Sequence, residues 1–361
     1  MWLALLFASD AACQEGEKLI NPVSMGIRGH YGFIIPHSQA IAGIANANPW
    51  SLEADLAWHL MRERIWKHCY CYPRTGISLN YINFGFPEVL GHSLAVYPYI
   101  EPYIRPQKSF SISFRFGMGP ALLSKVYDSE SNPDNFFFSN PLSFIVVVNA
   151  ALNYRLNSRL TTRAAFNYNH ISNGGLSQPN VGMNFPTANL GFDYSFTDVC
   201  IPRRDKDTAR VLYPDKFWWD AYLLGAMKEV DKEEEKSYPV FGAGIVYHIL
   251  VGRVLAINGG TEWISDYTVK EQIRREYTHD PASAPDHNRA AALLGFNLLF
   301  GRFSFMHQWG MYYYAPYPAR HQVYQRYGLN LRFTQKLYIG INVKAHGHVA
   351  DLMEGRLGVR F

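Results

Sequence analysis

Residues 109–118 read Ser-Phe-Ser-Ile-Ser-Phe-Arg-Phe-Gly-Met, so every second side chain is apolar and the side chains between them are small, hydroxylated or cationic. Successive side chains of a β-strand point to opposite faces, so a period of two predicts a strand with one apolar and one polar face. The same alternation returns at 327–333 and at 337–344, where asparagine, arginine and lysine again share the second face. The chain is therefore predicted to be all-β.

Alternation of this kind predicts a transmembrane antiparallel β-barrel of about 16 strands. Because strand boundaries read from a sequence are imprecise, any number of strands from 12 to 16 agrees with this prediction. We expect a single barrel over 25–361, with both termini in the periplasm and 197–361 supplying strands additional to 25–196. The predicted strands are 28–36, 52–61, 76–83, 90–100, 109–118, 143–154, 160–170, 186–196, 216–227, 239–250, 253–263, 289–300, 302–313, 325–334, 336–345 and 355–361.

A large soluble sandwich also alternates, so the choice of a membrane barrel rests on composition and connections. Aromatic residues make up 15% of the chain and charged residues only 18%, as expected for lipid-facing strands with interfacial aromatic girdles. Short turns on one side and long outer loops on the other are the outer-membrane pattern. The tight links fall at 156–158, 251–252, 301–302 and 334–335, and the longer ones near 120–141, 171–183, 229–238, 264–288 and 315–324.

The ends of the chain fit the same location. Residues 1–14 have a short apolar run followed by small residues, which predicts a secretory signal peptide. The basic residues that usually begin such a peptide are missing, so we interpret the signal peptide as truncated. The last strand ends at Phe361, the aromatic C-terminus typical of outer-membrane barrels. We therefore expect a multi-pass protein of a Gram-negative outer membrane. The charged segment 200–215 is interpreted as a plug, a small helix or a seam between two duplicated halves.

One strand carries a candidate catalytic pair. His170 and Ser172 share the face of Phe166 and Tyr168, while the polar residues of that strand occupy the other face, so base and hydroxyl lie on the lipid side. Asn184 has the same parity on the returning strand, across the hairpin. The loop between them contains Asn-Gly-Gly and Pro-Asn-Val-Gly, which permit tight turns and amide donors toward an oxyanion.

The stretch Phe-Asn-Tyr-Asn-His-Ile-Ser-Asn-Gly-Gly-Leu-Ser-Gln-Pro-Asn-Val-Gly-Met-Asn over 166–184 resembles the active-site region of PagL-type lipid A 3-O-deacylases, the acyloxyacyl hydrolase family. That resemblance implies an outer-membrane barrel esterase in which His170 is the base and Ser172 the nucleophile. It also places Asn173, Gly174 and Asn180 in the oxyanion and substrate loop. Two features depart from the family, which uses a glutamate where this chain has Asn184 and folds as an eight-stranded barrel.

An amide oxygen can hold the imidazole tautomer but cannot stabilise the imidazolium by charge, so a carboxylate of an outer loop is a candidate substitute. The candidates are Asp128, Glu130 and Asp134. The expected substrate is lipid A or a related acylated envelope lipid, bound from lipopolysaccharide in the outer membrane. No cofactor is required, and whether the barrel forms a homodimer is left open.

Two other functions remain as alternatives: an outer-membrane pore or transporter, and an inactive lipid-binding barrel. Scattered basic residues and a net charge of +4 do not indicate nucleic acid. His346-Gly347-His348, with Asp351 and Glu354 nearby, suggests a metal site, but the parity of the histidines favours polar lining of the barrel interior, so no metal is expected.

Overall fold

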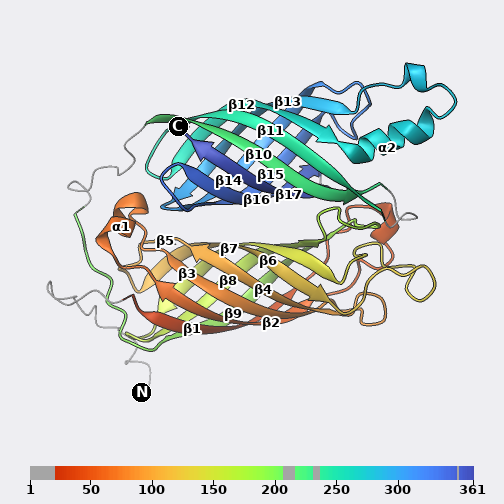
Figure 1. Cartoon of the computed structure of the whole chain (residues 1–361). Coiled ribbons are helices and arrows are strands. Elements are labelled where there is room, and N and C mark those ends of the chain that lie inside the picture. The colour runs from red at the N-terminus through yellow and green to blue at the C-terminus, as the bar shows by residue number, and fades with distance from the viewer. Residues whose placement is uncertain (1–20, 206–215, 231–235, 348) are drawn as a thin grey trace. The chain divides into compact units, whose positions relative to one another are not determined.

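The computed structural model describes residues 21–205, 216–230, 236–347 and 349–361, which form two antiparallel barrels (Figure 1). Eight long strands close the first barrel, because β4 pairs with β6 and β1 pairs with β9; the two-residue β5 extends the sheet beside β6. Its strands are β1 (Val23–Gly32), β2 (Trp50–His59), β3 (Arg74–Asn83), β4 (His92–Glu101), β5 (Tyr103–Ile104), β6 (Phe110–Leu123), β7 (Leu142–Arg155), β8 (Leu160–Ser172) and β9 (Met183–Ser195).

The second barrel has its own closure, in which β10 pairs with β17 and Leu223 lies opposite Leu357. Its strands are β10 (Phe217–Glu229), β11 (Ser237–Leu250), β12 (Leu255–Asp266), β13 (Asn288–Phe300), β14 (Phe303–Tyr314), β15 (Val323–Arg332), β16 (Leu337–His346) and β17 (Val349–Arg360). The described helices are η1 (Gln39–Ile41), α1 (Glu63–Cys69), α2 (Tyr267–Glu276) and η2 (Pro281–Ser283). None of them combines the length and the apolar run needed to cross a membrane.

The number of long strands agrees with the predicted 16, but the strands close as two barrels where the sequence analysis expected one over 25–361. The reason is the pairing of β9 with β1, in which Phe192 lies opposite Ile27; it returns the sheet to its own first strand. Alternation defines the faces of each strand but not its partner. The first barrel ends at Ser195 and the second begins at Phe217, which agrees with the interpretation of 200–215 as a seam between two halves. Residues 206–215 and the predicted signal peptide 1–14 lie outside the described residues.

Connections follow the predicted asymmetry. The short links are 156–159, 251–254, 301–302 and 333–336, while the outer end of each barrel carries longer loops that include 124–141, 173–182, 267–287 and 315–322. One periplasmic connection departs from this rule, because β2 and β3 are joined through α1 and a disulfide between Cys69 and Cys71. A disulfide is consistent with an oxidising compartment outside the cytoplasm.

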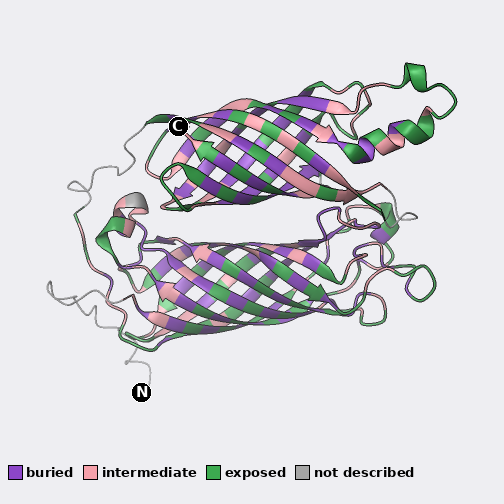
Figure 2. Cartoon of the chain, in the orientation of Figure 1, coloured by how far each residue is buried: buried purple, intermediate pink, exposed green. Residues whose placement is uncertain are grey.

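Figure 2 shows buried and exposed residues alternating along the strands of both barrels. The outward residues are apolar; Leu190 and Ile27 are 71% and 56% exposed. The inward residues are polar or charged, and Arg28 and Arg115 are each only 1% exposed. Apolar side chains outside and charged side chains inside are the reverse of a soluble sandwich, so the strands are those of a membrane barrel.

Charges inside the first barrel neutralise one another. Arg28 contacts Asp55 at 2.7 Å and Arg115 contacts Glu53 at 2.7 Å. Arg74 contacts Asp193 at 3.1 Å, and Arg163 pairs with Glu101. Because each buried charge has an opposite charge in contact, the desolvation that burial imposes is offset. The interior of the second barrel also contains a buried ion pair, in which Arg326 lies 2.8 Å from Glu262.

We expect Arg115→Ala to lower the free energy of unfolding by about 3–5 kcal/mol, because it leaves Glu53, Asp55 and Glu101 without one of their buried partners. Urea unfolding of the protein in detergent micelles measures this change. Arg159→Ala is the matched control, since its ion pair with Asp198 is exposed and contributes little. Equal stability of the two variants would contradict a structural role for the interior ion pairs.

Candidate active site

The β8–β9 hairpin brings the predicted catalytic residues to the outer end of the first barrel. His170 lies directly opposite Asn184 in the strand pairing, and β8 ends at Ser172. Phe166 and Tyr168, which have the same parity, are 59% and 43% exposed on the outside of the barrel. His170 and Ser172 therefore have the parity of the lipid-facing side, at the end of the strand, where His170 is partly buried and Ser172 is only 2% exposed.

Two hydrogen bonds join the three residues. His170 Nδ1 lies 2.7 Å from Asn184 Oδ1, and His170 Nε2 lies 3.0 Å from Ser172 Oγ. The amide oxygen can only accept, so Nδ1 carries the proton and Nε2 is left to accept from the Ser172 hydroxyl. This is the tautomer that a general base needs in order to take a proton from serine.

A second histidine, which the sequence analysis did not identify, contacts the site. His37 Nδ1 lies 3.4 Å from Asn184 Nδ2, and the nearby Ile35 N–H donates to the Asn184 carbonyl at 2.9 Å. The chain after β1 thus continues beside β9. Residue 37 stands outside any alternating run, so only the β1–β9 pairing, which sequence periodicity does not specify, brings it to the hairpin.

The loop predicted to hold an oxyanion is folded by its own asparagines. The Asn173 N–H donates to Asn180 Oδ1 at 3.2 Å, and the Gly175 N–H donates to Asn173 Oδ1 at 2.9 Å. Gly174 and Gly175 have φ angles of +66° and +82°, a region that favours glycine. Asn180 Nδ2 is buried and has no hydrogen-bond partner within the described parts of the chain, so it is a donor available to an incoming oxygen.

Gly182 ends the loop close to His170 and Ser172. Its N–H donates to the Phe137 carbonyl at 3.2 Å, and its φ is +72°. A Cβ at this position would lie 3.0 Å from His170 Cε1 and 3.3 Å from Ser172 Cβ. Glycine is therefore required here both by the backbone conformation and by the close approach to histidine and serine.

None of the carboxylates proposed as substitutes for the missing acid contacts His170. Asp128 Oδ1 accepts the Ser131 N–H at 2.7 Å, and this bond holds the pKa of the Asp128 carboxyl below its usual value. Among the residues that the structure describes, His170 is hydrogen-bonded to Asn184 and Ser172, and neither Glu130 nor Asp134 forms a hydrogen bond or ion pair with it. The third position is occupied by an amide.

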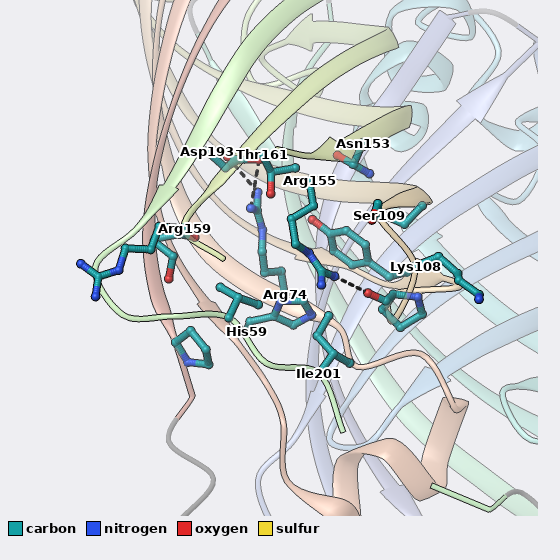
Figure 3. Close-up of a pocket in the computed structure, with 17 residues that line it drawn as sticks. His59, Arg74, Lys108, Ser109, Asn153, Arg155, Arg159, Thr161, Asp193 and Ile201 are labelled. Atoms are coloured by element: carbon teal, nitrogen blue, oxygen red, sulfur yellow. Dashed lines mark hydrogen bonds and ion pairs between the residues drawn. The ribbon is translucent and has the colours of Figure 1, made fainter. Parts of the chain in front are cut away.

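The barrel interior offers a recess at its periplasmic end, shown in Figure 3. His59, Arg74 and Arg155 are among the residues that line it, and Arg155 donates to the Pro106 carbonyl at 2.6 Å. Its volume is about 50 Å³, enough for a few water molecules but not for an acyl chain. The recess is therefore unsuited to a lipid substrate.

The metal alternative finds no support in the described residues. No group of three or more histidine, cysteine, aspartate or glutamate side chains there is placed to hold an ion. His346 is buried and lies 3.6 Å from Asp351, which also pairs with Lys228, while His348 falls outside the described residues.

Two family models match the chain. Residues 50–193 match the model described as lipid A 3-O-deacylase (PagL), and residues 217–361 match the acyloxyacyl hydrolase C-terminal domain. The two matches together take in most of the chain and divide it where the barrels divide. The chain belongs to the PagL lipid A deacylase family. As a member of this family it is an outer-membrane β-barrel protein of the lipid A deacylase type.

Solved structures similar to this PagL-family chain include the outer-membrane enzyme PagL, at 16% identity, covering 46% of this chain and 97% of that one with a TM-score of 0.34. Neisserial surface protein A has 9% identity, with 48% and 97% coverage and a TM-score of 0.32. A mutant Rhodopseudomonas blastica porin has 12% identity, with 94% and 99% coverage and a TM-score of 0.23. A search of curated proteins gave no match.

We expect Gly182→Ala to lower ester hydrolysis by about 10–100-fold, because the added methyl group displaces His170 from Ser172. Fatty acid released from purified lipopolysaccharide measures the loss. Gly301→Ala is the matched control: Gly301 has a similar φ of +71°, but its added Cβ would have no neighbour within 4 Å. If both variants kept full activity, the close approach of Gly182 would be irrelevant to the site.

Proposed function

We propose that this protein is an outer-membrane serine esterase that removes an ester-linked acyl chain from lipid A or a related envelope lipid. The observation that carries the proposal is the hydrogen-bonded chain of Ser172, His170 and Asn184 on the lipid-facing side of β8. A nucleophile of this parity lies on the lipid side of the strand and not in the barrel interior, and the surrounding loop leaves Ser172 only 2% exposed. The match of residues 50–193 to the lipid A deacylase model supports lipopolysaccharide as the source of the substrate.

The reaction begins when His170 Nε2 takes the Ser172 proton and Oγ attacks the acyl carbonyl. Asn180 Nδ2, the loop donor that has no partner within the described residues, stabilises the oxyanion. The C–O bond to the sugar then breaks, and His170 returns the proton to the leaving alkoxide. Water, activated by the same imidazole, hydrolyses the acyl-serine ester and releases the fatty acid.

Asn184 orients the imidazole without adding charge. Its oxygen fixes the proton on Nδ1 at 2.7 Å, as an acid would, but the imidazolium that forms during attack is stabilised only by a dipole. We therefore propose a working but slow site. Lipopolysaccharide binding without turnover is the outcome that would favour the inactive lipid-binding alternative.

The pore alternative is disfavoured by the interior of the barrels. An eight-stranded barrel has room only for its own inward side chains. In the first barrel this space is occupied by buried ion pairs such as Arg28–Asp55 and Arg115–Glu53. Arg326 and Glu262 occupy the same place in the second barrel.

We expect Ser172→Ala to lower acyl-chain release from purified lipopolysaccharide by at least about 10³-fold, because the nucleophile is removed. Mass analysis of lipid A before and after incubation measures it. Thr162→Ala is the matched control, since Thr162 is a hydroxyl residue of the same strand and parity whose Oγ1 donates to the Tyr154 carbonyl. If the Ser172→Ala variant released fatty acid at the rate of the parent protein, the serine mechanism would be wrong.

We expect Asn184→Asp to raise the rate by at least about tenfold, because a carboxylate stabilises the imidazolium by charge. Asn184→Ala should lower the rate by about 10²-fold, since Nδ1 loses its acceptor. Initial rates of fatty-acid release, measured at equal concentrations of folded protein, test both predictions. The assignment of Asn184 fails if the alanine variant is as active as the parent.

A further inference from the structure

A second serine–histidine pair lies at the outer end of the second barrel. Ser265 Oγ is 3.1 Å from His287 Nε2, and His287 Nδ1 is 3.4 Å from Asp286 Oδ1. The ring nitrogens have the same assignment as in the first barrel, with Nε2 toward the serine and Nδ1 toward the third residue. Here the third residue is a carboxylate.

Strand pairing explains how these residues meet. Ser265 is the penultimate residue of β12 and lies opposite Asn288, the first residue of β13. His287 and Asp286 directly precede β13, at the end of the long loop that contains α2. Ser265 and His287 are 22 residues apart in the sequence, and the pairing of β12 with β13 brings them into contact.

Ser265 has the parity of the lipid-facing residues of β12. Ile257 and Trp263, at even spacing from it, are 45% and 47% exposed. Trp263 stacks on Tyr314 of β14 with ring centroids 5.6 Å apart, and Tyr267 packs against the His287 ring at 5.5 Å. Aromatic side chains therefore lie beside the pair, as at a membrane–water interface.

Asp286 is held in place and ionised. Its Oδ1 accepts the Asn288 N–H at 3.1 Å and Asn288 Nδ2 at 2.8 Å, while Oδ2 accepts the Tyr314 hydroxyl at 2.9 Å. Burial alone would raise the pKa of the Asp286 carboxyl, but the bonds from Asn288 and Tyr314 hold it below the usual value. A fixed carboxylate beside Nδ1 orients the imidazole and stabilises its protonated form.

Access to the pair is retained. The side chains of His287 and Asp286 are 20% and 36% exposed, and Ser265 is only partly buried. A serine whose hydroxyl served only to tie β12 to the loop would need neither the aromatic neighbours nor a histidine with a carboxylate beside its Nδ1. Hydroxyl, imidazole and carboxylate in this order are the arrangement that activates a serine.

We propose that Ser265, His287 and Asp286 form a second esterase site, which takes the acyl ester of an amphipathic lipid at the membrane interface. His287 Nε2 accepts the Ser265 proton while Oγ forms a bond to the acyl carbon. The alkoxy C–O bond breaks, and the leaving oxygen receives the proton from His287. Water then cleaves the acyl-serine ester, which releases the carboxylic acid and restores the serine hydroxyl.

The test uses full-length protein carrying Ser172→Ala, so that the first site contributes nothing. A fluorophosphonate probe should bond to Ser265 Oγ with loss of fluoride, and peptide mass analysis should locate the adduct. The same protein should hydrolyse a long-chain p-nitrophenyl ester. Adding Ser265→Ala should abolish both signals, and adding Asp286→Asn should lower the labelling rate by at least about tenfold.

Thr261→Ala in the same background is the matched control, because Thr261 is a lipid-facing hydroxyl of β12 that contacts Tyr313 but no histidine. It should keep the labelling and the hydrolysis. Absence of both signals from the Ser172→Ala protein would overturn the second site. That result would leave the role of Ser172 untouched, because Ser172 is judged by lipopolysaccharide turnover in protein with an intact first site.

Discussion

The structure depends on one constraint: within a bilayer each backbone N–H and C=O must be paired inside the protein, and only a closed sheet satisfies this with strands. The first barrel meets the constraint by pairing β9 with β1, and the second by pairing β10 with β17. Closure determines which loops share an end of the barrel. It also brings the segment after β1 to β9, where His37 approaches Asn184.

Closure of eight strands leaves an interior that only side chains can fill, and here those side chains are charged. The arrangement is stable because arginines and carboxylates alternate in contact, as in Arg28 between Asp55 and Asp193. Polar residues are thereby concentrated inside, and the outer face is left to apolar and aromatic side chains. A histidine and a serine that share the outer face at a strand end cannot be explained as interior lining, and their position supports the proposed esterase chemistry.

Much of this was accessible from sequence. Alternation located all sixteen long strands, and parity put His170, Ser172 and Asn184 on one face because a strand's period of two is a local property. Strand partners are not local, so the division into two barrels could not be read from any one strand. For the same reason, the sequence did not predict the contact of His37 with Asn184 or the contact of Ser265 with His287. Each contact depends on the register between segments that are far apart in the sequence.

The third residue distinguishes the two serine–histidine pairs. Asn184 Oδ1 lies 2.7 Å from the His170 Nδ1 and orients it without charge, whereas Asp286 Oδ1 lies 3.4 Å from the His287 Nδ1 and supplies charge at a longer distance. Alignment favours the correct tautomer in the resting state, and charge favours the imidazolium that appears only as the serine attacks. Since only the second effect grows toward the transition state, a carboxylate is the stronger aid to rate, provided that substrate binding shortens the 3.4 Å separation. An acyl chain packed against Trp263 would exclude water from the Asp286–His287 contact and strengthen it.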